Sequence, residues 1–578
     1  MRVLALLRYL ETKEAMKKVI CLCASALLLG SGSMFAQGEM DAYKFSQYDL
    51  NGTARYLSMG GAFGALGGDI SAMRTNPAGL AIYRSSEVVT TLSLSSIKTN
   101  TDWLGIGMDD KKTRFNFDNI AYVGYFPTGN DEGVIGWNVG FSYNRVKNFN
   151  RQYRMGRGAG GNSISDYLAG YANLGIDPTT GKGLTGNDLW STDSYNPYLS
   201  QEWLPTLAYN GGLIDTDNKG QAGTFYTTFG YFDEKGEWLP LEVQSADMFV
   251  SEKGAIDKYD FSFATNISNR FFIGATVSVT DIDYSTTSLY DEDFGYFNAE
   301  AEKNDFRDQL YWDNYSSLNG TGYSFNLGVI ARPTDFLRLG IAYNSPTWYK
   351  MTNYYSAEAQ AYVYDYYANI QNPIDPSNPD MSRKAETPTD FYTEYRLRTP
   401  DKWIFSAAAI LGQNALISVD YELTNYKSMH LQDRDGYDQA RDNGFIKDDF
   451  RTSGMLKVGA EYKVTPQFAI RVGGAWQNSP VQEHMKYSET GSITEVYPAG
   501  TRTAYTIDHH INYYTVGLGY RFTPNFYVDL ACVYRMQKEE VYPFPHLIDE
   551  NKNVLVESIP ATLKTNTTKV ALTLGYKF

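Results

Sequence analysis

The chain has 578 residues, with 66 acidic and 51 basic side chains, a formal net charge of −15 and a slightly negative mean hydropathy. This acidic balance argues against a nucleic-acid partner. The 47 tyrosines and 51 glycines, without long apolar helices, favour a β-protein whose strands carry an apolar residue at every second position.

Residues 1–36 are predicted to be a signal peptide that is removed from the mature chain. From Met16, the predicted start, two lysines precede an apolar core and a run of small residues. That core is too short to span a bilayer as a membrane anchor. Cleavage after Ala36 leaves Cys532 as the sole cysteine, so we expect no disulfide.

Residues 37–85 precede the first predicted strand and are rich in glycine. They are too many for a turn and too rich in glycine for a domain with its own core. We therefore expect them to fold back into the lumen of a barrel as a plug, or hatch. At residues 76–80, Asn-Pro-Ala-Gly-Leu, a regular strand is interrupted. Proline lacks the N–H that a strand needs, and glycine permits turns that few other residues tolerate.

The hatch supplies the candidate residues for ligand contact and gating. We expect the amide of Asn76 to tie the hatch backbone to the barrel wall while Pro77 holds the bend. The apolar side chains have two interpretations, because they either line a pocket or pack the hatch against the wall. The candidates are Asn76, Pro77, Ala78, Gly79, Leu80, Phe63, Leu66 and Met73.

From residue 86 to the C-terminus, apolar and polar residues alternate with a period of two. In the last segment Val570 and Leu572 fall on one face, whereas Ala571 and Thr573 fall on the other. Such alternation is typical of strands with one apolar face. The predicted strands are 86–97, 117–126, 134–148, 257–268, 270–286, 318–332, 336–350, 393–411, 414–430, 451–464, 467–482, 506–522, 525–540 and 564–578.

The connections between these strands alternate in length. Every second connection is a short turn, such as 522–526, and the others are long polar stretches, such as 98–116, 149–257 and 287–317. Bacterial outer-membrane barrels have short periplasmic turns, long external loops and even strand numbers. A soluble sandwich is the alternative, but its core does not need regular charges in mid-strand, whereas a watery lumen accepts them. We therefore predict an all-β transmembrane antiparallel β-barrel of about 14 strands, residues 86–578, in the Gram-negative outer membrane.

Charged residues on the lumen face also have two interpretations. They form a salt-bridge lattice that rigidifies the barrel, or an arginine among them grips a ligand carboxylate. The candidates are Arg471, Arg521, Arg535, Asp420 and Glu422.

The final strand ends in alternating aromatic residues, Tyr576 and Phe578. This ending resembles the signal that barrel-assembly machinery reads, so we expect that machinery to be a partner.

We expect no cofactor, no metal site and no enzymatic activity. His509 and His510 are adjacent, so on a strand they point to opposite faces. No spacing in the sequence singles out a histidine held by a serine or a carboxylate, as a hydrolase requires.

Residues 54–81, ARYLSMGGAFGALGGDISAMRTNPAGLA, resemble the hatch of the FadL/TodX family of outer-membrane transporters for hydrophobic compounds, which includes OmpP1-type proteins. Two barrel segments, LGIAYNSPTWYKM (339–351) and the strand pair that begins RTPDKW, are also similar to that family. The hatch residues that match the family are Gly60, Gly61, Gly64, Asp69 and Asn76-Pro77-Ala78-Gly79.

The resemblance implies passive uptake of hydrophobic small molecules, such as long-chain fatty acids or aromatic hydrocarbons. It further implies that the hatch contacts the ligand and that a kinked strand opens a lateral exit toward the lipid. Such a route is physically reasonable, because lipopolysaccharide excludes apolar solutes, whereas an apolar pocket solvates them. The implied partners are the outer-membrane bilayer, lipopolysaccharide and the hydrophobic ligand.

The stretch 149–257 departs from this pattern, because it is larger than a ligand-capture loop requires. The same fold also serves as an accessory barrel in bacterial protein secretion. The alternative function is therefore a scaffold whose external loops bind exported proteins or surface partners.

Overall fold

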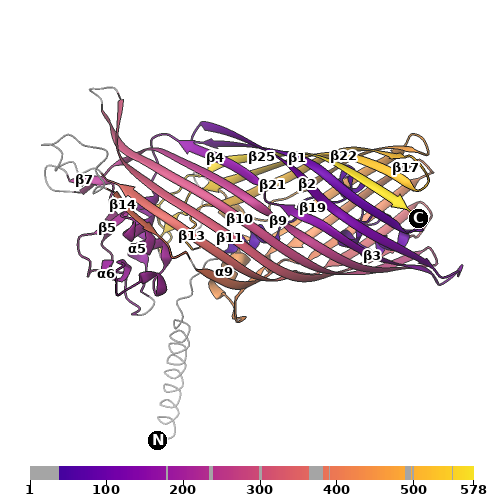
Figure 1. Cartoon of the computed structure of the whole chain (residues 1–578), viewed down its shortest axis with the longest axis horizontal. Helices are drawn as coiled ribbons and strands as arrows, with labels where there is room; N and C mark the ends of the chain where they lie inside the picture. The colour runs from indigo at the N-terminus through magenta and orange to yellow at the C-terminus, as the bar shows by residue number, and fades with distance from the viewer. Residues whose placement is uncertain are drawn as a thin grey trace, which may run out of the picture.

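The computed structural model of the protein describes residues 38–177, 180–232, 238–298, 303–363, 382–389, 391–487, 496–497, 500–549 and 551–578. The predicted signal peptide, residues 1–36, lies outside these ranges. The described residues form a long antiparallel barrel of tilted strands, with short helices gathered at one end (Figure 1). None of their helices is long and apolar enough to cross a membrane.

One antiparallel sheet of 19 segments forms the barrel wall. Its first segment, β1 (Glu87–Trp103), pairs with both β2 and the last segment, β25, so the sheet is closed. Five segments belong to the same wall strand as a neighbouring segment, which leaves fourteen wall strands in the described part of the chain. The predicted fold class is confirmed.

The other wall segments are β2 (Ile106–Pro127), β3 (Val134–Asn148), β4 (Arg151–Arg157), β9 (Glu242–Ile267), β10 (Phe271–Asn298), β11 (Lys303–Ala331), β12 (Leu337–Asn344), β13 (Trp348–Tyr362), β14 (Ser382–Glu386), β15 (Tyr392–Arg398), β16 (Lys402–Leu411), β17 (Ala415–Asn425), β18 (His430–Asp433), β19 (Thr452–Lys463), β20 (Phe468–Gln477), β21 (Tyr505–Arg521), β22 (Phe526–Tyr542) and β25 (Ala561–Lys577). The segments that share a wall strand with a neighbour are β4, β13, β14, β15 and β18.

Side chains alternate between the outer surface and the lumen along the wall strands. On β25, Val570 and Leu572 are exposed, whereas Ala571 and Thr573 are buried. An apolar outer face suits lipid, and a face of small and polar residues suits a filled lumen.

Several strands extend far beyond the predicted ends. Residues 98–116, predicted to be a loop, form the outer part of the β1–β2 hairpin, which turns at Leu104 and Gly105, both with positive φ. Residues 287–317 likewise extend β10 and β11, apart from 299–302, which are not described. The sequence pattern misses these extensions because both faces become polar once the strand leaves the lipid, while backbone pairing continues.

Two predicted strands are interrupted by prolines that lie side by side. Pro346 separates β12 from β13, and Pro400 separates β15 from β16. Proline has no N–H for the ladder, so each strand breaks there. The gap is closed by other bonds, since Thr347 N donates to Thr399 Oγ1 (2.8 Å) and Thr399 N donates to Thr347 O (3.0 Å).

The chain between β4 and β9 folds as a cap over the end of the barrel opposite the short turns (Figure 1). The cap contains α5 (Ile164–Leu174), α6 (Gly186–Leu189), η2 (Pro197–Leu199), α7 (Trp203–Asn210), β5 (Ile214–Thr216), β6 (Phe225–Thr227), β7 (Gly230–Phe232) and β8 (Trp238–Pro240).

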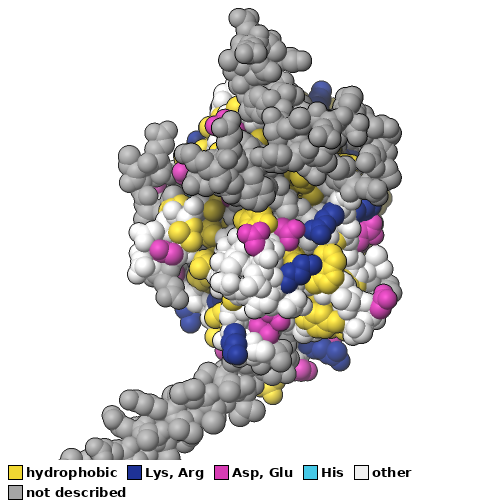
Figure 2. Space-filling model, turned by 90° about the vertical axis from the view of Figure 1, so that its left-hand side faces the viewer, with side chains coloured by type: hydrophobic (Ala, Val, Ile, Leu, Met, Phe, Trp, Pro, Cys, Tyr) yellow, Lys and Arg dark blue, Asp and Glu magenta, His cyan; other side chains and the backbone are white. Residues whose placement is uncertain are grey.

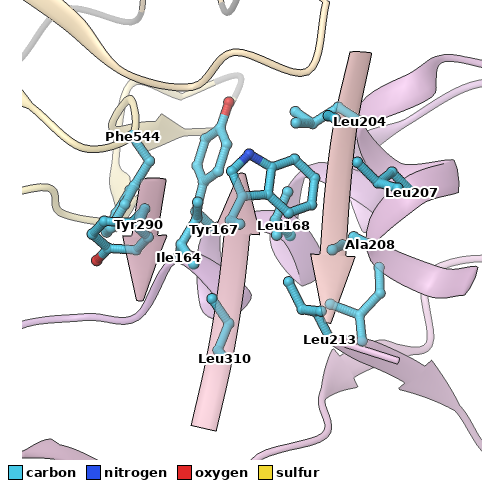
Figure 3. Close-up of a cluster of buried hydrophobic side chains, with 14 of the residues drawn as sticks. Ile164, Tyr167, Leu168, Leu204, Leu207, Ala208, Leu213, Tyr290, Leu310 and Phe544 are labelled. Carbon is cyan, nitrogen blue, oxygen red and sulfur yellow. The ribbon is translucent and has the colours of Figure 1, made fainter. Parts of the chain in front are cut away.

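The cap has a hydrophobic core that it shares with the barrel wall. Figure 3 shows Leu168 of α5 and Leu207 of α7 packed with Leu310 of β11 and with Phe544, which follows β22. The first turn of α5 is fixed by Glu292 of β10, whose carboxylate accepts bonds from the Ser163 hydroxyl and from Ile164 N (3.0 Å). The long stretch is therefore a folded unit and not a set of open loops.

The N-terminal segment, residues 38–86, lies within the barrel, and we call it the plug. It contains α2 (Glu39–Ser46), α3 (Ala54–Ser58), α4 (Ala72–Thr75) and the 3-10 helix η1 (Pro77–Ile82). Thr53 begins α3 by accepting a bond from Tyr56 N (3.1 Å). Most plug side chains are buried against the wall.

The contacts of Phe578 generate a prediction about assembly. Its backbone N–H donates to Ser86 O (3.0 Å), and its ring stacks on Tyr122 and Tyr576. We expect deletion of Phe578 to lower the folded, outer-membrane fraction severalfold, because the closing β1–β25 edge loses its last contacts and its terminal aromatic residue. Heat-modifiable migration of membrane fractions measures this yield. Phe522→Ala removes another exposed aromatic residue of the same barrel end as a control, and equal yields would contradict the role of Phe578.

Candidate functional site

The plug backbone touches the wall where the wall strands carry glycine. A Cβ added to any of seven wall glycines would overlap plug atoms. Because these strands present no side chain at the contact, plug backbone atoms come close to four of the glycines, and plug side chains fill the space at the other three. The seven are Gly140 of β3, Gly274 of β10, Gly328 of β11, Gly340 of β12, Gly459 of β19, Gly473 of β20 and Gly517 of β21.

Asn76 joins two parts of the plug to this wall. Its Nδ2 donates to Gly64 O (2.6 Å) in the plug and to Val329 O (3.3 Å) in β11. Its Oδ1 accepts a bond from Ala78 N (3.1 Å) and so begins η1 directly before the turn at Pro77. The expected tie between Asn76 and the wall is present, whereas its role in gating stays a prediction.

The other hatch candidates are buried in packing contacts. Phe63 and Leu66 belong to one buried cluster, and Met73, Ala78 and Leu80 belong to another that includes wall residues. Gly79 has no room for a side chain, because a Cβ there would lie 2.8 Å from the Cβ of Ala72. None of these residues lines the three cavities described below, so the structure places them where they pack the plug against the wall.

Ion pairs cross the lumen between the plug and the wall. Arg471 pairs with Glu461 (2.6 Å) and Asp529 (2.5 Å), and Arg55 of the plug pairs with the same Glu461 (3.0 Å). The wall groups are almost fully buried and Arg55 is half-buried, and each has an opposite charge at hydrogen-bond distance. This arrangement matches the lattice interpretation of the lumen charges.

Two further candidates, Glu422 and Asp420, also have partners at hydrogen-bond distance. Glu422 pairs with Lys457 (2.7 Å) and with Lys402. Asp420 accepts a bond from Gly64 N (2.8 Å), so it holds the plug backbone. Arg521 does not join them: it is exposed at the end of β21, beside the short turn to β22. The alternation assigns it to the lumen face, but the strand has left the enclosed lumen at that point.

The first of three cavities lies between α2, β4 and β9 and has a volume of about 110 Å³. Its polar side is built from ion pairs, including Lys44–Glu252 (2.7 Å) and Arg151–Glu539 (2.6 Å). Its apolar side includes Phe149, which belongs to a buried aromatic cluster.

Arg535 is the one predicted lumen residue that lines this cavity, and it also lines the second cavity, described below. It donates to Gln537 Oε1 (2.6 Å) and Tyr513 Oη (3.2 Å). Sequence reasoning missed Lys44, Arg151 and Arg502, because two of these cations lie outside the predicted strands and one lies in the plug. Lys44 lies between Tyr43 and Phe45, and Arg151 lies two residues from an aromatic residue on each side, which was the available signal; Arg502 has no such neighbours.

The wall has a seam between β2 and the β3–β4 strand. Backbone pairing of β2 with β3 stops at Asn119 and Asn144, and the described part of β2 before Asn119 has no backbone pair on that side. β3 shifts register against β9 after Arg145 and ends at Asn148.

Side chains close the seam in place of the missing ladder. Asn148 Nδ2 donates to Asn116 Oδ1 (2.8 Å), and Gln152 Nε2 donates to Asp110 Oδ1 (2.8 Å). A second cavity, of about 100 Å³, lies directly behind and is lined by Asn116, Asn148 and the plug residue Asn51. At the seam the wall is therefore held by bonds of side chains, with a cavity directly behind them.

The third cavity, of about 90 Å³, lies inside the wall at the two proline breaks. It is lined by Thr347, Pro400 and the plug residue Arg74. Here two bonds between Thr347 and Thr399 close the wall, and one of them joins backbone groups. The seam is different, because there only bonds of side chains close the wall.

One end of the plug carries an unpaired buried acid. Glu39 of α2 is buried, and neither of its carboxylate oxygens has a hydrogen-bond partner in the described residues. α9 (Ala440–Asp449), in the connection between β18 and β19, packs on α2 and brings Asp442 and Asp449 near it. Burial, followed by these two carboxylates, raises the pKa of Glu39 to about 8.

Comparisons with known proteins agree with the architecture. A family model described as "Outer membrane protein transport protein (OMPP1/FadL/TodX)" matches residues 261–578, the wall from the end of β9 to the C-terminus. The 47 kDa outer membrane protein of Pasteurella multocida (strain Pm70) is 25% identical over 269 residues, which are 46% of this chain and 52% of that protein. The chain thus spans about half the length of this curated relative.

Solved structures with a similar fold include a FadL homologue of Pseudomonas aeruginosa, with 13% identity and a TM-score of 0.46. The toluene transporter TodX of P. putida has 11% identity and a TM-score of 0.45. Each comparison covers 92% of this chain and 99% of the other.

The contact between Asn76 and Gly328 can be disturbed by a substitution of either residue, and this generates a prediction. Asn76→Ala removes the bonds to Gly64 and Val329, and Gly328→Val fills the space that Asn76 occupies. We expect each change to weaken plug seating by about 1–3 kcal/mol while the barrel still assembles. Faster hydrogen exchange at Ala78 N–H and a higher ion conductance in planar bilayers measure the loss.

Gly107→Val is the matched control, because a Cβ there lies no closer than 3.7 Å to Thr101 O. Folded Asn76→Ala and Gly328→Val variants whose plug amides remain as protected as in the unmodified protein would rule out the seating role.

The pKa of Glu39 generates a prediction about pH. The carboxyl titrates at about 4.5 when α2 is undocked and at about 8 when docked, so docking weakens about tenfold per pH unit between these values. Below pH 4.5 the effect vanishes, and above pH 8 it is complete. We expect Glu39→Gln to remove this dependence, so that α2 amides of the variant are better protected at pH 8 and equal at pH 4. Protection factors that fall equally with pH in both proteins would contradict this.

Proposed function

Because the chain belongs to the OMPP1/FadL/TodX family of outer membrane transport proteins, we propose that it is a passive uptake channel for amphipathic hydrophobic molecules of the long-chain fatty acid class. The route runs from the cap end into the lumen and leaves through the seam between β2 and β3 into the bilayer. A side exit spares an apolar solute any passage through periplasmic water.

The seam is the observation that carries this proposal. Along most of the wall, neighbouring strands are joined by backbone ladders, and at the proline breaks a backbone bond joins Thr399 to Thr347. At the seam, Asn116–Asn148 and Asp110–Gln152 are bonds between side chains, which a rotamer change opens without breaking a strand. A cavity and a plug residue already lie behind it.

The chemistry of the first cavity supports a substrate with an anionic head. Lys44, Arg151 and Arg502 line it, next to the aromatic side chains of Phe149 and Tyr284. An arginine binds a carboxylate through two parallel bonds, and aromatic rings solvate an alkyl chain. In the present state Glu252, Glu539 and Asp41 occupy these cations, so a fatty acid would compete with protein carboxylates.

The structure corresponds to a closed state of the channel. The three cavities, of about 90–110 Å³ each, are much smaller than ligand pockets, which occupy roughly 300–1,000 Å³. Transport therefore requires the plug to move, and we propose that the turn at Asn76 and Pro77 sets the position to which it returns. Transport of this kind needs no bond chemistry, and we propose none.

A second candidate function is the binding of exported proteins or other surface partners by the cap. Leu174, Ile176 and Leu199 of the cap are exposed, at 48%, 64% and 75% of their surface. Figure 2 shows hydrophobic side chains between charged ones at this end of the molecule. Exposed leucine and isoleucine on a folded cap suit a protein partner.

A reversible cross-link across the seam tests the exit route. In a Cys532→Ser background, Asn116→Cys and Asn148→Cys are joined by a bis-methanethiosulfonate reagent. We expect oleate uptake by cells or proteoliposomes to fall at least tenfold and to recover when a reductant removes the linker. Oleyl alcohol, which lacks the carboxylate, is expected to enter more slowly than oleate, because the cationic cavity no longer favours it.

Ser96→Cys with Thr113→Cys is the matched control, since these residues lie opposite each other on β1 and β2 and leave the seam free. Unchanged oleate uptake by the cross-linked protein would exclude the seam as the exit. A protein that never takes up oleate or toluene, yet retains a polypeptide partner that Leu199→Asp releases, would favour the second candidate.

A further inference from the structure

The outer surface of the wall carries a group of lysines near the cap end of strands β22, β25, β1 and β2. Lys538 of β22 lies directly opposite Lys564 of β25. Lys98 of β1 lies directly opposite Lys111 of β2. Lys564 is also paired with Asn100, two residues from Lys98, so the two lysine pairs are diagonal neighbours, about 7–8 Å apart. We call these four residues the lysine cluster.

All four side chains point away from the lumen. Lys98, Lys111 and Lys564 are exposed and Lys538 is half-buried, whereas the next residues on β22 and β25, Glu539 and Thr565, are buried. Residues that face each other across an antiparallel pair share a side of the sheet. The cluster therefore faces the surroundings of the barrel.

Equal charges directly opposite each other destabilise a sheet, and here two such pairs are adjacent. Lys98 has one partner, Asp109, at 3.6 Å, and both side chains of this pair are more than half exposed. In the described residues no ion pair involves Lys111, Lys538 or Lys564. The cluster thus keeps a net positive charge on a chain whose overall charge is −15, and an external anion would relieve the repulsion.

The position of the cluster relative to the lipid defines the anion further. Toward the opposite barrel end, the same strands present an apolar belt that includes Tyr534, Val570, Leu94 and Phe115, all exposed. The ladder places Val570 opposite Leu94, and Leu94 opposite Phe115. Lys564 lies six residues beyond Val570 on β25, about 20 Å along the strand. Along these strands the lysines lie directly beyond the apolar belt, just as lipid headgroups lie directly beyond the acyl chains of a bilayer.

The outer face of a neighbouring part of the wall has the opposite charge. On β9 and β10, Asp247 faces Asp291 and Asp257 faces Asp281. This part of the wall therefore differs in charge from the lysine cluster.

We propose that the lysine cluster binds the phosphates of a phosphorylated, multiply acylated lipid of the outer leaflet, the chemistry of the lipid A part of lipopolysaccharide. The phosphates bridge the two lysine pairs, and the acyl chains lie on the belt of Tyr534, Val570, Leu94 and Phe115. Opposed lysines, three of them without an ion pair in the described residues, lie directly beyond a lipid-facing belt and form a headgroup site on the outer face of the wall.

The test compares binding of two probes by the full-length protein, purified free of lipopolysaccharide. Bisphosphorylated lipid A and its dephosphorylated form are titrated in detergent, and binding is measured by native mass spectrometry. We expect the unmodified protein to bind the phosphorylated form at least tenfold more tightly. Lys538→Gln/Lys564→Gln, and the variant with all four lysines changed to glutamine, should lose that preference. Lys182→Gln/Lys552→Gln, which removes two exposed cap-end lysines, should keep it.

Thermal unfolding separates lipid binding from simple destabilisation. Without lipid, the four-fold variant should melt at or above the temperature of the unmodified protein, because the repulsion is gone. With lipid A, the unmodified protein should gain more than the variant. No preference for the phosphorylated probe, or a preference that survives in the four-fold variant, would overturn the proposal. Equal protection by inorganic phosphate alone would overturn the assignment to a lipid.

Discussion

The close approach of the plug backbone to the barrel wall is the contact on which the rest of the structure depends. Seven wall strands carry glycine where the plug touches them, so side chains do not hold the two apart. The plug therefore combines apolar packing against the wall with backbone and amide contacts, of which those of Asn76 and Asp420 are examples. Buried ion pairs such as Arg55–Glu461 add direction to this contact, because breaking one partner leaves an uncompensated charge.

For the uptake route that we propose, this tight fit of the plug restricts where a molecule can leave the lumen. The plug fills the section between the cap and the short turns, so a straight path along the axis would require its complete removal. A sideways exit requires a much smaller rearrangement of the protein, because at the β2–β3 seam the wall lacks a ladder and is held by Asn116 and Asn148. The ion pairs of the first cavity are compatible with such a sideways exit, since ion pairs can exchange partners without a change in backbone structure.

The sequence was sufficient for the architecture but not for the site. Period-two alternation predicts the lipid-crossing parts of the wall, because lipid enforces an apolar outer face on strands such as β25. It does not predict the extensions of β1, β2, β10 and β11, where water surrounds both faces. The proline residues Pro346 and Pro400 were visible in the sequence, yet only the register places their breaks side by side.

For the lumen, the sequence predicted which positions carry a charged side chain, but it did not predict the residues with which these side chains pair. Arg471 and Glu422 follow from the position of a charge on the lumen face, whereas Arg521 fails because a face assignment does not tell where the enclosed lumen ends. The seam was beyond sequence reasoning altogether, since it consists of missing backbone pairs. The Asn-Pro break was the one hatch feature whose local chemistry sufficed to predict a contact with the wall.

The plug contacts also determine an order of events during folding. Ala54 N, at the start of α3, donates to Thr573 Oγ1 on the last strand, 519 residues later in the chain (2.7 Å). The cap core likewise joins Leu168 to Leu563, at the start of that strand. Contacts between such distant positions form late. The N-terminal segment therefore completes its contacts only when the C-terminal strand arrives, so the barrel closes around its own plug.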